Sequence, residues 1–103
     1  PTPRQLSSAE KYRRCLRILD LSRASLERCI ASHPGASSNE AEQLLKAAQD
    51  ALSQKVPAHV TNELAEETLR LAERIWEARI KACGARTVAE EEPLRLIMEK
   101  LVR

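Results

Sequence analysis

The strongest constraint on the fold is the stretch from Pro57 to Gly84 (PAHVTNELAEETLRLAERIWEARIKACG), which carries the longest uninterrupted helical pattern in the sequence. Proline stands at its front and glycine just past its end, an asymmetry typical of helix termini. Its apolar residues form two neighbouring rows, one through Leu64 and Ile75 and the other through Leu69 and Trp76. Two rows make a wide apolar arc, so we expect this helix to contact more than one neighbour.

The same three- and four-residue period predicts three more helices. We expect them over residues 8–32, 40–55 and 90–103, besides the one over 57–83. Pro34 ends the first, because proline cannot continue a helix and disfavours helical backbone in the residue before it. The two prolines in residues 1–6 (PTPRQL) predict an extended lead-in there.

Capping boxes support two of these helix starts. Ser7 with Glu10, three residues on, predicts the start of the first helix. For the second helix, either Asn39 with Glu42 or Ser37 with Glu40 has the required spacing. A short connection between the second and third helices favours antiparallel neighbours.

The chain has 103 residues, which suits a single domain over 1–103. Ala, Leu, Glu, Arg and Lys dominate, and these are good helix formers, whereas the strand-favouring Val, Ile and Thr are sparse. The order long, short, long, short therefore predicts an all-α fold, a four-helix bundle made of two helical hairpins.

Basic residues outnumber acidic ones in the first helix, although the whole chain carries a formal charge of only +2. Such a face suits an acidic protein partner or a phosphate backbone. RNA modules usually add exposed aromatic side chains, and the only aromatic here, Tyr12, lies on the apolar side. The predicted basic face comprises Lys11, Arg13, Arg14, Arg17 and Arg28.

The three cysteines, Cys15, Cys29 and Cys83, are odd in number and lack a CxxC spacing, which argues against a disulfide framework or a zinc cluster. A reducing compartment follows, so we expect an intracellular protein, with cytoplasm and nucleus both open. No apolar run approaches the roughly 20 residues needed to cross a bilayer, so we expect no membrane contact. The N-terminal residues show no signal peptide.

The residues that could carry chemistry have simpler interpretations. Cys29 and His33 are four apart, and His59 and Cys83 would complete a metal set, but the cysteines occupy helical core positions. The acidic runs Glu66-Glu67 and 90–92 (EEE) are better explained as a solvated face and a helix start. We therefore predict no catalytic residues, no metal and no cofactor, and a chain that is not an enzyme.

The apolar surplus of the last two helices is the most informative functional signal. We predict a non-enzymatic adaptor or scaffold domain that docks a partner helix or peptide in an apolar groove. An RNA- or DNA-associated module using the first helix and a homodimeric scaffold are the alternatives. The predicted docking residues are Leu69, Trp76, Ile80, Leu94, Met98 and Leu101.

Overall fold

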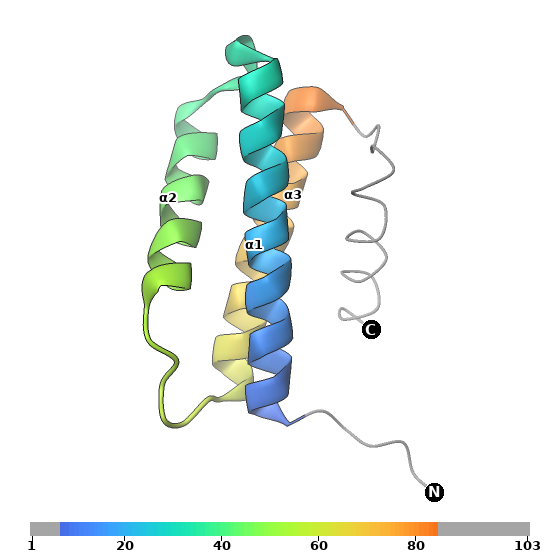
Figure 1. Cartoon of the computed structure of the whole chain (residues 1–103). Helices are drawn as coiled ribbons and strands as arrows, with labels where there is room; N and C mark the ends of the chain where they lie inside the picture. The colour runs from blue at the N-terminus through green and yellow to red at the C-terminus, as the bar shows by residue number, and fades with distance from the viewer. Residues whose placement is uncertain (1–6, 85–103) are drawn as a thin grey trace, which may run out of the picture.

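The computed structural model describes residues 7–84 of the chain, and these residues are helical with no strand (Figure 1). Helix α1 spans Ser8–Ser32, a 3₁₀ turn (η1) spans Pro34–Ala36, α2 spans Asn39–Ser53 and α3 spans Asn62–Cys83. The all-α class is confirmed. The predicted lead-in 1–6 and the predicted helix 90–103 lie outside the described residues, so the three helices described do not confirm a four-helix bundle.

Helix α1 has the predicted bounds. The Ser7 hydroxyl accepts a hydrogen bond from the Glu10 backbone N–H at 3.2 Å, as the capping box predicts. At the other end, the backbone N–H of His33 donates to the Cys29 carbonyl, and Pro34 follows in the 3₁₀ turn. Local chemistry alone therefore accounts for both ends of α1.

The predicted cap of α2 is wrong by one residue. Ser38, rather than Asn39 or Ser37, caps the helix, and its hydroxyl accepts from the Ala41 backbone N–H at 3.1 Å. The turn after Pro34 leaves Ser38 with the extended backbone that a cap requires, and Asn39 is already helical. The Ser37 hydroxyl donates instead to the Glu42 carboxylate at 3.3 Å.

The predicted start of α3 at Pro57 is also wrong, because the helix begins at Asn62. A helix starting at Pro57 would have Val56 as its cap, and valine has no side-chain oxygen to accept from the free N–H groups of the first turn. Thr61 supplies that oxygen, accepting from the Leu64 N–H at 3.1 Å. At the other end, Gly84 has a φ of 83°, which confirms the predicted glycine stop.

Helices α1 and α3 run parallel, with α2 antiparallel to both (Figure 1). Near their N-termini, the Ser8 hydroxyl donates to the Asn62 side-chain oxygen at 3.1 Å, and at their C-termini a disulfide joins Cys29 to Cys83. Both pairs join residues 54 positions apart, so the two helices keep one register along their length.

This register makes the packing of α1 against α3 complementary in size. Seven residues before the disulfide on each helix, Ser22 lies level with Trp76, and seven residues further back Cys15 lies level with Leu69. Ser22 and Cys15 are fully buried at 0% exposure. The register therefore pairs small side chains on α1 with large ones on α3.

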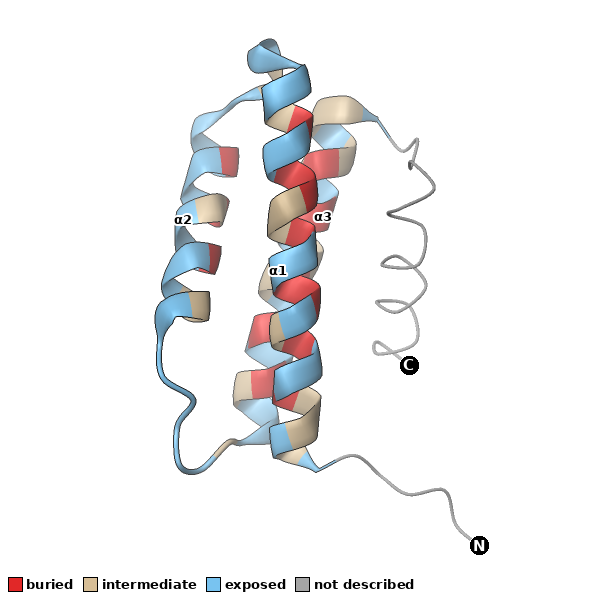
Figure 2. Cartoon of the chain, viewed as in Figure 1, coloured by how far each residue is buried: buried red, intermediate tan, exposed pale blue. Residues whose placement is uncertain are grey.

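Most of the core lies between α1 and α3, and α2 contributes a narrow apolar edge (Figure 2). The second apolar row of α3 faces α1, as the disulfide at Cys83 demonstrates, while Ala78 and Ala82 lie beside the start of α2. The expectation that this helix contacts two neighbours is confirmed. The buried core residues are Tyr12, Cys15, Ile18, Leu19, Leu26, Ala41, Leu44, Ala48, Ala65, Leu69, Ala72, Ile75 and Trp76.

No helix within residues 7–84 is both long enough and apolar enough to cross a bilayer.

Candidate functional site

The described part of the predicted apolar docking row is largely covered. Leu69 and Trp76 are 6% and 7% exposed, and Ile80 is half-buried. The buried guanidinium of Arg79 lies over the Trp76 ring, 5.5 Å from its centroid, and donates to the Gly84 carbonyl at 3.2 Å. The other three predicted docking residues, Leu94, Met98 and Leu101, lie outside the described residues.

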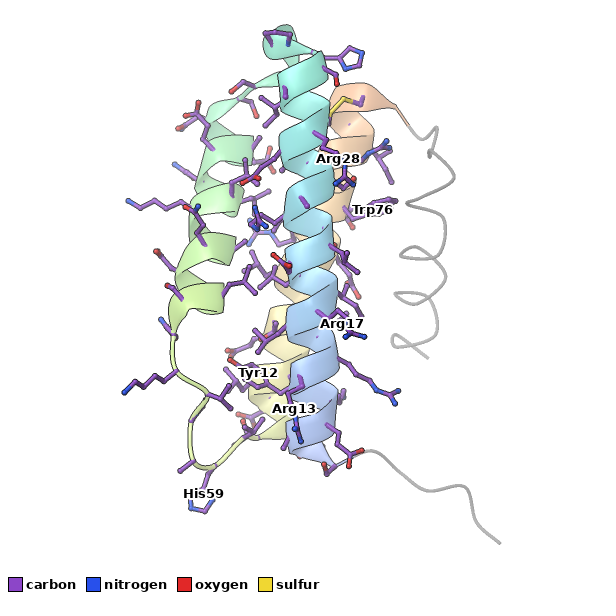
Figure 3. All side chains as sticks on the ribbon, in the orientation of Figure 1. Tyr12, Arg13, Arg17, Arg28, His59 and Trp76 are labelled. Carbon is purple, nitrogen blue, oxygen red and sulfur yellow. A yellow bond between two sulfur atoms is a disulfide. The ribbon has the colours of Figure 1, made fainter. Side chains whose placement is uncertain are left out.

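The predicted basic residues of α1 separate into two groups. Arg13, Arg14, Arg17 and Arg28 are exposed, and Figure 3 shows Arg17 and Arg28 on the side of the bundle away from α2. Lys11 is half-buried, and its ammonium group lies 3.7 Å from a Glu66 carboxylate oxygen on α3. The four arginines therefore form the exposed basic face, while Lys11 helps to join two helices.

The acidic side chains in the middle of α1 are held by another arginine. Arg23 lies 2.8 Å from the carboxylates of both Asp20 and Glu27, at spacings of three and four residues. These hydrogen bonds, to Asp20 first and Glu27 second, raise the pKa of Arg23 above its ordinary value. Both carboxylates therefore have a partner in Arg23, which does not belong to the exposed basic face.

An exposed leucine lies within this basic face. Leu21 is 42% exposed, and apart from Val56 it is the only large hydrophobic residue among residues 7–84 that is exposed. It follows Arg14 by seven residues and Arg17 by four, which places all three on one stripe of the helix. Leu21 lies outside the apolar stripe of the helix, and this position in the sequence pattern could have indicated its exposure. Our prediction did not use it.

We call Arg13, Arg14, Arg17, Leu21 and Arg28 the arginine stripe. From Arg14 to Arg28 it extends about 21 Å along α1 at 1.5 Å per residue. It combines exposed positive charge with one exposed apolar side chain.

The expectation of unpaired cysteines is wrong for two of the three. Cys29 and Cys83 form a disulfide with their Cα atoms 6.3 Å apart. The spacing of the cysteines in the sequence does not predict this disulfide, because the pairing depends on the parallel register of α1 and α3. With two of the three cysteines bonded to each other, the number of cysteines no longer indicates a reducing compartment.

The third cysteine is buried and reduced. Cys15 is 0% exposed, and burial raises the pKa of its thiol, an effect that nearby Lys11 partly opposes. A thiol with this environment is a packing group rather than a nucleophile.

The candidate metal set does not come together within residues 7–84. Cys29 and Cys83 are bonded to each other, and His59 lies in the loop at the opposite end of the bundle from their disulfide (Figure 3). No group of three His, Cys, Asp or Glu side chains in the described residues could hold a metal ion. Only His33 remains near the sulfurs, with its Nδ1 3.7 Å from the Cys83 Sγ.

A shallow depression of about 360 Å³ lies between the start of α2 and the end of α3. Its lining is mostly small side chains, together with the oppositely charged Glu40 and Lys81. This lining lacks the convergent polar groups of a substrate pocket.

Comparisons of the chain with protein families, with curated proteins and with solved structures found no match.

Proposed function

We propose that this chain is a non-enzymatic interaction domain that binds an acidic amphipathic helix of another protein along the arginine stripe of α1. The observation that carries the proposal is an exposed leucine flanked by exposed arginines, with the nearby carboxylates engaged by Arg23.

The dimensions of the stripe suit a helical partner. A partner helix of about four turns matches its length of about 21 Å. Glutamates on that helix would pair with Arg14 and Arg17, and an apolar side chain between them would cover Leu21. Such charge complementarity selects partners and speeds their association more than it adds affinity.

The aromatic residues favour a protein over a single-stranded nucleic acid. Tyr12 and Trp76 are the only aromatic residues of the chain, and both are buried, at 5% and 7% exposure. Proteins that bind single strands stack bases on exposed aromatic rings. A second copy of the chain is also disfavoured, because its own stripe would bring like charges together.

The test uses a labelled synthetic peptide with glutamates around a central leucine at helical spacing, and measures binding by fluorescence anisotropy. We expect Arg14→Glu with Arg17→Glu to weaken binding by about tenfold or more, since each reversed pair is worth ~1 kcal/mol. The control reverses Arg70 and Arg74, two exposed arginines of α3. It should change the affinity less than twofold.

A second pair of variants tests the apolar contact. Leu21→Asp should weaken binding of the peptide, whereas Val56→Asp, at the other exposed hydrophobic residue, should not. The proposed site would be contradicted if Arg14→Glu with Arg17→Glu weakened binding no more than reversal of Arg70 and Arg74, and Leu21→Asp no more than Val56→Asp. Tighter binding of a single-stranded RNA than of the peptide, weakened by salt, would favour the nucleic-acid alternative, and dimers in sedimentation would favour the homodimer.

A further inference from the structure

The two cysteines of the disulfide differ in how accessible they are to solvent. Cys29 lies in the last turn of α1 and is 7% exposed. Cys83 is the last residue of α3, is half-buried and precedes the exposed Gly84. An external thiol or disulfide therefore reaches Cys83 more readily than Cys29, and exchange chemistry depends on such access.

One imidazole lies close to the Cys83 sulfur, and two cationic side chains belong to the same end of α3. The His33 Nδ1 lies 3.7 Å from the Cys83 sulfur, and Arg79 donates to the carbonyl of Gly84, the residue after the cysteine. The last turn also carries Lys81. The C-terminal end of α3 disfavours a thiolate through the helix dipole, and these groups oppose that effect.

We propose that Cys83 is a reversible thiol-modification site, which forms a mixed disulfide with a small thiol such as glutathione, and that Cys29 resolves this intermediate. In the oxidising direction, the Cys83 thiolate attacks one sulfur of glutathione disulfide. The Cys83–glutathione bond forms, the glutathione S–S bond breaks, and one glutathione leaves as its thiolate.

The second step regenerates the structure described above. The Cys29 thiol releases its proton to solvent and attacks the Cys83 sulfur, which expels the second glutathione as a thiolate. Two protein thiols are oxidised to one disulfide, and one glutathione disulfide is reduced to two thiols. Cys15 takes no part, because it is fully buried.

The site adjoins the arginine stripe only at Arg28, the residue before Cys29, and the effect of the disulfide on the fold follows from its position. The disulfide joins the C-terminal turns of α1 and α3, whose N-terminal ends meet through Ser8 and Asn62. Reduction frees only the C-terminal end of this helix pair. The redox state of the cell thus controls how firmly that end is closed.

The test starts from the full chain, reduced and freed of reductant, and adds glutathione disulfide. In Cys29→Ser we expect one glutathionyl group to accumulate on Cys83, located by peptide mass spectrometry. In the wild type we expect this adduct to be transient and to give way to the Cys29–Cys83 disulfide. Cys83→Ser should be modified at Cys29 about tenfold more slowly.

The two histidines of the chain give a matched pair of controls. In the Cys29→Ser background, His33→Ala should slow modification of Cys83, whereas His59→Ala, in the distant loop, should not. Equal rates in these two variants, or equal reactivity of Cys29 and Cys83, would overturn the proposal.

A measurement on the wild-type chain covers the case in which a cysteine variant fails to fold. Reduced wild-type protein is treated with iodoacetamide below one equivalent, and the labelled peptides are counted. Labelling of Cys83 ahead of Cys29 and Cys15 supports the proposal. Labelling spread evenly over the three cysteines contradicts it.

Discussion

Reduction of the Cys29–Cys83 disulfide is the perturbation whose effect can be worked out most directly from the structure. The bond closes a loop between residues 54 positions apart. In the chain-entropy treatment, a loop of this length restricts the unfolded chain by an amount worth about 4 kcal/mol at 25 °C. Small domains have total stabilities of roughly 5–15 kcal/mol, so reduction should remove a large part of the free energy of unfolding.

The assay is urea denaturation of the oxidised and the reduced protein, followed by the fluorescence of Trp76 and by far-ultraviolet circular dichroism. The fluorescence should respond to unfolding because Trp76 is buried against Arg79. We expect a lower midpoint for the reduced protein. We also expect a steeper dependence on urea, because the uncrosslinked chain exposes more surface on unfolding.

A control variant separates the disulfide from the effect of losing a thiol. Cys15→Ala removes the buried cysteine that is not bonded. It should lower the free energy of unfolding of the oxidised and of the reduced protein, and leave the difference between the two near 4 kcal/mol. A difference below about 1 kcal/mol would refute the reasoning. That result would mean that the ends of α1 and α3 stay together in the unfolded chain without the bond.

Three further predictions concern packing, capping and pH. Ser22→Leu should cost about 1–3 kcal/mol in urea denaturation, because Ser22 is fully buried at the level of Trp76 and the larger side chain has no space, whereas Ser22→Ala should cost less. Thr61→Ala should cost about 1 kcal/mol by the same measurement, since the Leu64 N–H loses its acceptor at the start of α3. Because burial raises the pKa of Cys15 in the folded state, the stability of the protein should fall as the pH rises above about 9, where the unfolded thiol ionises first. Cys15→Ala should remove this part of the decline, and identical pH profiles for the two proteins would contradict it.

The features that were predicted correctly depend on neighbours in the sequence. The bounds of α1 follow from the Ser7 cap and from Pro34, and the end of α3 follows from Gly84. The incorrect starts of α2 and α3 are also local, since the wrong capping residue was chosen for α2 and Pro57 was taken as the first residue of α3. Ser38 and Thr61 were available from the sequence, but several residues of similar type stood nearby.

The candidate site was only partly predictable. The arginines of α1 follow from the period of the helix, and their exposure agrees with that pattern. The role of Arg23 in holding Asp20 and Glu27 depends on rotamers that the spacing permits but does not select. For Trp76, the period indicated an apolar face and left open whether a helix or solvent would meet it.

The sequence by itself determined that residues 7–84 form helices, where most of these end, and which face of each is apolar, because all three follow from interactions within a few residues of the chain. Only the tertiary structure decided that α1 and α3 run parallel with a constant offset of 54 positions. That register places Trp76 level with the small Ser22 of α1 and brings Cys29 to Cys83. The physical reason is that each helix can present its apolar face to any partner of matching shape, and the choice among partners is made by packing across the whole bundle.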